Sequence, residues 1–347
     1  MDKNPLVSIV ILNRNGKRHL KDSLQSILKT NYDNYEIILV DNASSDGSPE
    51  FVRRAFPQIK IVQSESNRGI PAGYNLGISH AKGKYVATLN NDLEVDPKWL
   101  QFLVEVMEKF PDVAATDAKY LNYYIRCKFD TCAAAGRYID FVGNPVTRGF
   151  DEEDKGQYNE ITRVFHSSTL WRRKVLEEVG LLDEDFFYGF DDTDLSWRLN
   201  LRGHRILYVP SSHIYHKVGG STFLESPSKE RCVRVRFKPR FYFFLKRNRI
   251  VTVFKNYSLQ TLLRLLPLIL FEQFGYIIYW SMRRDKQYSL ESFGAIIWCL
   301  KNFKKIWAKH EFVQSIRKVG EHEVMKLMAP YFGDPVKFLT KKYYLHL

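Results

Sequence analysis

Three acidic residues, Asp191, Asp192 and Asp194, lie close together in the segment Tyr188–Leu199, which reads YGFDDTDLSWRL. Apolar and aromatic positions follow them, so the spacing predicts the first turn of a short amphipathic helix. Acids at a helix N-terminus stabilise its free N–H groups and its dipole, and a capping cluster is therefore one interpretation. A carboxylate that accepts a proton during catalysis is the other.

A second acidic site, Asn90-Asn91-Asp92, closes the apolar run Tyr85–Leu89. A polar residue at the carboxyl end of a buried strand faces the crevice where open α/β sheets bind ligands. The presence of two such sites in one chain favours chemistry over capping alone.

Alternating strand and helix patterns must position these acids. The short β-branched runs typical of buried parallel strands are Val7–Leu12, Glu36–Val40, Ile59–Val62 and Tyr85–Leu89. The helical patterns lie at about Leu20–Leu28, Ser48–Ala55, Ala72–Ser79 and Pro97–Phe110. This alternation predicts an α/β fold with a doubly wound, mostly parallel sheet flanked by helices.

The turn after the first strand indicates whether the sheet could bind a dinucleotide. Asn13-Arg14-Asn15-Gly16-Lys17 contains one glycine, whereas a dinucleotide-binding turn needs G-x-G-x-x-G. The backbone therefore lacks that pyrophosphate cradle, which argues against a nicotinamide-dependent dehydrogenase.

The second strand ends in Asp41, whose carboxylate could accept hydrogen bonds from a nucleotide base or ribose. The alternative is an Asx turn, with Ser44 or Ser45 capping the next helix.

The third strand leads into Asn67-Arg68-Gly69, followed by Gly73 and Asn75. Arg68 offers a cation for a phosphate, the glycines permit close backbone approach, and Asn75 supplies an amide. An ordinary transition from loop to helix explains the glycines equally well.

Five segments together carry a family resemblance: VSIVILNRNG, VDNASSDGS, NRGIPAGYNLGI, TLNNDLEVDP and FFYGFDDTDLSWRLNLRGHRILYVP. In this order they resemble the successive motifs of family 2 inverting glycosyltransferases with the GT-A fold, in particular the rhamnosyltransferase-like branch. The resemblance covers roughly residues 5–220.

The resemblance implies roles for individual residues. Asp41 would bind the nucleotide base, Asp92 would hold a divalent metal on the donor diphosphate, and Asp192 would be the general base beside Asp191. The donor-binding residues implied in this way are Asn13, Asp41, Asn67, Arg68, Gly73, Asn75 and Asn91.

Two positions depart from the family pattern. The usual D-x-D is Asn90-Asn91-Asp92, which leaves one carboxylate for Mg²⁺ or Mn²⁺. His216 falls where related enzymes place a metal-binding histidine, so we expect Asp92 and His216 to share the metal; a structural histidine is the alternative. Asp191 replaces the usual Glu, which preserves the charge but shortens the side chain.

Retaining glycosidases also use two carboxylates, but they need no phosphate-binding residues at strand ends. On the acceptor side, Trp171 and Tyr188 could stack on a sugar or serve as core aromatics, whereas Trp197 is expected in the core.

Charge divides the chain into two parts. Ser228–Leu347 contains 24 Lys/Arg against 8 Asp/Glu, a net charge of +16. The total of 52 against 39 leaves 28 against 31, or −3, for residues 1–227. We therefore expect a catalytic domain over 1–227 and a basic helical region over 228–347.

The basic region has two notable segments. Arg231–Lys255 interleaves cations with Phe and Tyr, and Leu259–Met282 is apolar but interrupted by Arg264, Pro267, Glu272 and Gln273. Charges at a bilayer centre are costly, so we expect a basic amphipathic helix in the interface of an anionic membrane rather than a spanning helix. A single-stranded nucleic-acid binder and a solvated helical bundle are the alternatives.

The four cysteines form no CxxC pair, and the N-terminus lacks a signal-peptide pattern, which favours a reduced, cytoplasmic protein. The complete prediction is a peripheral glycosyltransferase on the inner face of the cell membrane. Its donor would be a nucleotide-diphosphate sugar, first dTDP-rhamnose or otherwise a UDP-sugar, and its acceptor a lipid-linked glycan. No nucleic-acid partner is expected.

Overall fold

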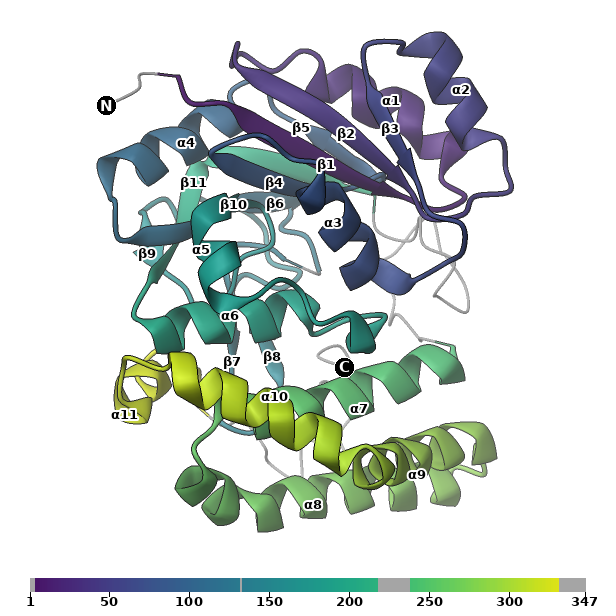
Figure 1. The fold of residues 1–347 in the computed structure, drawn as a ribbon, viewed down its shortest axis with the longest axis vertical. Coiled ribbons are helices and arrows are strands. Elements are labelled where there is room, and N and C mark those ends of the chain that lie inside the picture. Colours follow the sequence, from purple (N-terminus) through teal and green to yellow (C-terminus); the bar gives the residue numbers. More distant parts are fainter. Residues whose placement is uncertain (1–3, 132, 218–237, 331–347) are drawn as a thin grey trace.

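A computed structural model describes residues 4–131, 133–217 and 238–330, and it places an α/β half above a layer of C-terminal helices (Figure 1). The strands are β1 Val7–Asn13, β2 Tyr35–Asp41, β3 Lys60–Gln63, β4 Tyr85–Asn90, β5 Leu93–Val95, β6 Val113–Asn122, β7 Arg137–Ile139, β8 Pro145–Thr147, β9 Thr162–Arg163, β10 Leu170–Arg172 and β11 Arg205–His216. The helices are α1 Lys17–Ile27, α2 Ser48–Ala55, α3 Gly69–Ser79, α4 Trp99–Lys109, α5 Arg173–Val179, the 3₁₀ turn η1 Glu184–Phe186, α6 Asp191–Arg202, α7 Pro239–Asn256, α8 Leu259–Met282, α9 Lys286–Lys301, α10 Phe303–Ile316 and α11 Glu321–Met325.

The main sheet has the order β3-β2-β1-β4-β10-β6-β11-β5, with β9 paired to β11. Strands β1 to β4 are parallel, whereas β10 runs antiparallel to β4 and β6. The chain reverses its winding direction at β1 and β4, so a crevice opens beyond the carboxyl ends of these two strands. Register places Asn13 opposite Asp41 there, and Leu12 opposite Asn90.

The predicted α/β class is confirmed, and each of the four N-terminal strands and helices lies within three residues of its predicted position. The later expectations were less accurate. Of the expected strand Ala133–Val142, only β7 forms, because Ala134 and Gly136 adopt positive φ angles of 42° and 109° that interrupt an extended chain.

The C-terminal helices share a core with the α/β half. Trp197 of α6 is buried, and its ring meets that of Tyr257 edge to face at 4.8 Å between centroids. Val253, Leu262 and Val313 belong to the same apolar cluster. The expectation that Trp197 is a core residue is confirmed.

Helix α7 holds four of its five cations inside the molecule, and only Arg240 in its first turn is exposed. Lys246, Arg247, Arg249 and Lys255 are all at most 5% exposed. The part of Arg231–Lys255 before residue 238 lies outside the described residues. Within α7, the expectation of a basic face turned toward a membrane was wrong, because these side chains face carboxylates, carbonyls and aromatic rings of the protein itself.

Candidate active site

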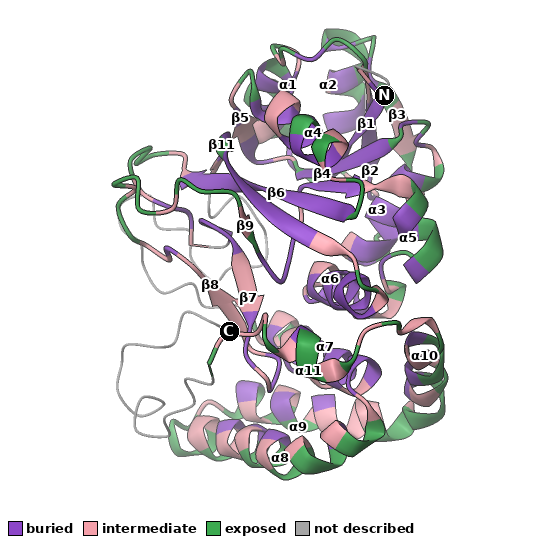
Figure 2. Ribbon diagram, turned by 90° about the vertical axis from the view of Figure 1, so that its left-hand side faces the viewer, coloured by how far each residue is buried: buried purple, intermediate pink, exposed green. Residues whose placement is uncertain are grey.

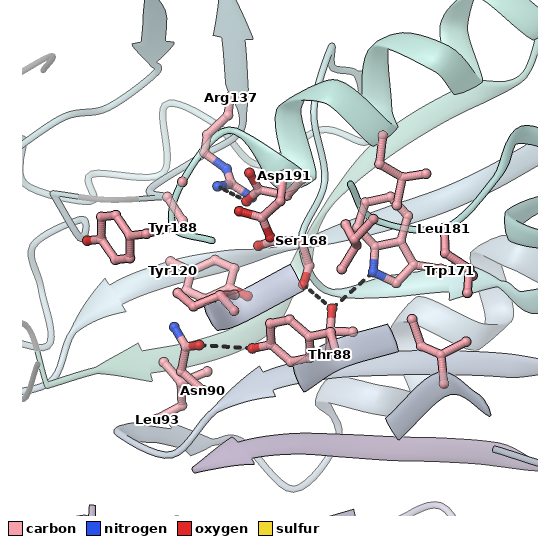
Figure 3. A pocket seen from close by; sticks show the side chains of 18 of the residues that line it. Thr88, Asn90, Leu93, Tyr120, Arg137, Ser168, Trp171, Leu181, Tyr188 and Asp191 are labelled. Carbon is pink, nitrogen blue, oxygen red and sulfur yellow. Dashed lines mark hydrogen bonds and ion pairs between the residues drawn. The ribbon is translucent and has the colours of Figure 1, made fainter. Parts of the chain in front are cut away.

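A cavity of about 220 Å³ lies between the sheet and the start of α6 (Figure 3). In Figure 3, Arg137 and Asp191 lie on one side of it, and Thr88 and Asn90 of β4 lie on the other. The polar and aromatic residues that line it include Tyr74, Thr88, Asn90, Tyr120, Asp130, Arg137, Ser168, Trp171, Tyr188, Asp191, Asp192 and His216. The cavity therefore brings the predicted catalytic acids together with His216.

Helix α6 begins at Asp191, as predicted, and Phe190 before it adopts a left-handed conformation with φ 68°. Phe190 provides no side-chain cap, while the carboxylate of Asp192 accepts a 2.9 Å hydrogen bond from the Thr193 N–H. The acids thus stabilise the first turn in part, but Asp191 and Asp192 also face the cavity.

Two side chains hold the carboxylate of Asp192. Nη1 of Arg137 donates to its Oδ2 at 3.2 Å, and Nε2 of His166 lies 3.0 Å from the same oxygen. Burial opposes ionisation, yet His166 and Arg137 hold the pKa of Asp192 well below its usual range. Burial and Arg137 also lower the pKa of His166, so the permanent positive charge in this group is that of Arg137.

Asp191 has the opposite electrostatic environment. Burial, together with the neighbouring charge of Asp192, raises the pKa of Asp191 to about 8. Near neutral pH the pair therefore holds one proton, on Asp191, and one negative charge, on Asp192.

Asp194 is fully buried and faces away from the cavity. Its carboxylate accepts hydrogen bonds from Arg198 at 3.1 Å, from Lys255 at 2.9 Å and from Asn256 at 2.9 Å. The third acid of the motif thus joins α6 to α7.

Asp92 and His216 also lie together, as predicted. Nε2 of His216 is 3.5 Å from Oδ2 of Asp92, and Nδ1 is 3.2 Å from Oδ2 of Asp130. Burial alone would lower the pKa of His216, but Asp130 and Asp92 raise it well above its usual value.

This arrangement fits a divalent cation. A histidine ligand commonly donates its second ring N–H to a carboxylate, which is the position of Asp130. Mg²⁺ binds through one or two protein ligands and completes its shell with substrate phosphates and water. Asp92 and His216, whose side chains lie 3.5 Å apart, would be the protein's ligands. No cluster of three or more metal-binding side chains occurs among the described residues.

Three of the predicted donor-binding residues meet beyond the ends of β1, β2 and β4. The amide of Asn91 donates to Oδ1 of Asn13 at 2.7 Å, and Nδ2 of Asn13 donates to Oδ1 of Asp41 at 3.1 Å. The Ser44 N–H donates to the other Asp41 oxygen, as in the Asx turn considered above. These side chains lie outside the cavity lining, at the crevice of the strand reversal.

The remaining donor-binding candidates make contacts within the protein. The Asn75 amide bonds the backbone of Leu182 in both directions, at 2.8 and 3.1 Å, and Asn67 accepts from the Gly69 N–H. Exposed Arg68 pairs with Glu184 at 2.8 Å. These contacts bind the loop after β3 to the segment that leads into α6.

Gly73 has a packing role, because an added Cβ would lie 2.4 Å from Cδ1 of Leu12. Both acceptor-side candidates line the cavity. Trp171 is 3% exposed and donates through its indole N–H to Thr88 at 3.0 Å, whereas Tyr188 packs edge to face on Phe241.

Sequence reasoning missed Arg137, His166 and Asp130. All three come from the segment between the two acidic sites, where strand signals were mixed and no charge spacing marked a site. Only the fold brings Arg137 to Asp192, 55 residues further along the chain.

Comparison with known proteins identifies the class. The model of glycosyl transferase family 2 matches residues 8–180, and the chain belongs to this family. An uncharacterized glycosyltransferase of Haemophilus influenzae is 27% identical over 196 residues, covering 55% of this chain and 59% of the relative. A poly-beta-1,6-N-acetyl-D-glucosamine synthase of Staphylococcus epidermidis is 29% identical over 208 residues, covering 59% and 48%. The chain thus spans about half to three-fifths of these relatives' length.

Solved structures agree on the fold. The crystal structure of GalNAc-T7 with UDP, GalNAc and Mn²⁺ aligns with a TM-score of 0.55 at 19% identity, over 73% of this chain and 48% of that one. That of S. aureus TarS aligns with a TM-score of 0.50 at 15% identity, over 93% and 50%. The fold is of the GT-A type.

Proposed function

We propose that this chain moves a sugar from a nucleotide-diphosphate donor to a hydroxyl of a lipid-linked glycan, with inversion at the anomeric carbon. One observation carries the proposal: a single cavity is lined by the acid pair Asp191–Asp192 and by His216, the partner of Asp92. A base and a site for the leaving diphosphate are the two requirements of this transfer.

The reaction needs one displacement. The acceptor oxygen forms a bond to the anomeric carbon from the face opposite the diphosphate, and the bond from that carbon to the phosphate oxygen breaks. Asp192, which is ionised, takes the acceptor proton, and the nucleoside diphosphate leaves with the bonding electrons. A single displacement inverts the configuration.

Asp92 and His216 would hold the divalent metal, Mg²⁺ or Mn²⁺, which when bound neutralises charge on the leaving diphosphate. Asp130 orients the His216 ring from its other side. The amides of Asn13 and Asn91, with Asp41, supply polar groups for the nucleoside at the neighbouring strand ends.

The proposal also names the donor and the acceptor. The rhamnosyltransferase-like motifs favour dTDP-rhamnose, while the UDP and GalNAc in the GalNAc-T7 structure make a UDP-sugar the second candidate. A glycan acceptor is in keeping with the poly-beta-1,6-N-acetyl-D-glucosamine synthase among the relatives, and we propose that this glycan is linked to a lipid.

A panel of nucleotide sugars tests the proposal by calorimetry in Mn²⁺ with the full chain. We expect one donor to bind and its binding to need the metal. Asp192→Asn should retain donor binding and lose transfer. Failure of every donor to bind would overturn the proposal and favour a non-enzymatic membrane- or nucleic-acid-binding protein.

A further inference from the structure

Helix α8 exposes a continuous apolar stripe. Leu263, Phe271, Phe274, Ile278 and Met282 are 61%, 67%, 51%, 58% and 80% exposed. Their spacing of three, four or eight residues places them on one face of the helix. A monomeric soluble surface rarely presents so many large apolar side chains together.

Helix α9 extends this surface. It packs beside α8, and its exposed residues Leu290, Phe293 and Leu300 are three and seven residues apart, which places them on one face of α9. Figure 2 shows both helices at the edge of the molecule remote from the main sheet, with exposed residues on their outer sides. We name the outer apolar side chains of the two helices the α8–α9 face.

Glu272 and Gln273, two of the polar residues within α8, lie on the side of the helix opposite the apolar stripe. Glu272 pairs with buried Arg249 of α7, and Gln273 is fully buried. Trp280 donates to the Tyr242 hydroxyl of α7 at 2.9 Å. One side of α8 is therefore fixed to the protein by polar contacts, which leaves the other side mainly apolar, with Gln260, Arg264 and Ser281 as its exposed polar residues.

Cations border the α8–α9 face. Arg283 and Arg284 lie at the turn between the helices, Lys286 begins α9, and Lys301 ends it, and all four residues are exposed. Residues 259–316 contain eight Lys/Arg against four Asp/Glu. The charge at this edge is complementary to anionic lipid headgroups.

We propose that the α8–α9 face binds the anionic surface of a phospholipid bilayer, with both helices lying in the interface and Arg283, Arg284 and Lys286 at the headgroups. Helix α8 has the length and the mean hydropathy, 1.5, of a spanning segment. Its bonded inner side holds it against α7, so only its outer half enters the lipid. The inner leaflet of the cell membrane is the surface with this charge.

This inference deepens the proposed function, because a lipid-linked acceptor lies at such a surface. It also assigns membrane attachment to a different feature from the basic residues that the sequence indicated. The buried cations of α7 take no part, and the apolar outer side of α8 and α9 supplies the contact.

Vesicle flotation of the full chain tests the inference, with phosphatidylcholine vesicles that contain or lack phosphatidylglycerol. We expect flotation with the anionic vesicles and at least tenfold weaker binding after Phe271→Ser/Phe274→Ser. The matched control is Tyr124→Ser/Ile161→Ser, which removes side chains of 63% and 49% exposure from the α/β half and should leave binding unchanged.

The charge variant is Arg283→Gln/Arg284→Gln/Lys286→Gln, which should remove the preference for anionic vesicles. Its control, Arg54→Gln/Lys60→Gln/Lys82→Gln, neutralises three exposed cations of the α/β half and should retain the preference.

Several results would overturn the inference. One is that the unmodified chain does not float with the vesicles, and another is that the Phe271/Phe274 variant floats as well as the unmodified chain. A third is that the bound protein resists carbonate extraction, which would mean a spanning helix. A dimer that dissociates in the same variant without any vesicle binding would assign the face to self-association. Donor binding, measured without vesicles, tests the proposed function separately.

Discussion

Lys255 of α7 donates to the carboxylate of Asp194 in α6 at 2.9 Å, although both side chains are almost completely buried. Lys255 also reaches Asp183 at 2.7 Å, and Lys309 of α10 pairs with the same carboxylate. The helix that begins with the catalytic acids is thus fixed from behind by the C-terminal region. The two halves of the chain share these ion pairs and two apolar clusters of buried residues.

Lys255→Met tests this connection. It leaves the carboxylate of Asp194 buried beside Arg198 and Asn256 alone, and breaking a buried ion pair costs about 3–5 kcal/mol. We expect the free energy of unfolding to fall by that order in denaturant titrations. The control, Lys305→Met, removes a cation with a 56% exposed side chain from Asp185 and should cost less than about 1 kcal/mol. Equal losses in the two variants would contradict the role of the buried pair.

The proton on Asp191 should make stability depend on pH. Its pKa is about 8 in the folded protein against 3.8 ordinarily, so the folded state binds the proton more tightly. The resulting stabilisation is complete below about pH 4 and is lost as the pH rises through about 8. The slope reaches up to about 1.4 kcal/mol per pH unit.

Asp191→Asn should therefore flatten the fall in unfolding free energy between pH 5 and pH 9, measured by denaturant titration. Exposed Asp33→Asn is the control and should keep the wild-type slope. A curve for Asp191→Asn that runs parallel to the wild type would show that Asp191 ionises normally.

The metal site is expected to depend on both Asp92 and His216. Asp92→Asn removes the carboxylate, and His216→Ala removes the ring 3.5 Å from it. Each should weaken Mn²⁺ binding by about tenfold or more, since Asp130 lies on the far side of the ring and cannot replace either ligand. Calorimetry with the metal alone measures this directly. The control is His213→Ala, at the other histidine of the segment, and unchanged Mn²⁺ affinity in both site variants would refute the assignment.

Asp192→Asn should lower kcat by about a hundredfold or more while donor affinity stays within about threefold, because a lost general base affects the transfer step. Asp191→Asn keeps the ionised carboxylate and should be the milder change. Initial rates and donor titrations of both variants distinguish the two acids. If Asp191→Asn is inactive and Asp192→Asn is active, the base is Asp191.

The sequence predicted the strands and helices that are determined by their own local residue pattern. The strands end where polar residues interrupt β-branched runs, so Asn13, Asp41 and Asp92 lie near their expected positions. The pattern could not show that the amide of Asn75 would be used within the protein, or that four of the five cations of α7 would be buried. Both features depend on contacts between segments far apart in the chain. The contacts of Arg137 and His166 with Asp192 depend on such packing too.

Arg137 should act as a positioning residue that lowers the pKa of Asp192. Its guanidinium supplies the lasting charge beside Asp192, since His166 has a lowered pKa. In Arg137→Gln, this charge no longer offsets burial, so the pKa of Asp192 rises. The acid limb of the kcat profile should move to higher pH by about one unit or more, which reduces kcat on the acid side of the profile. Arg137→Lys keeps a charge and should recover part of the shift, whereas exposed Arg163→Gln, outside the cavity, should leave the profile unchanged. A lower kcat with an unmoved acid limb would mean that Arg137 acts only by shaping the cavity.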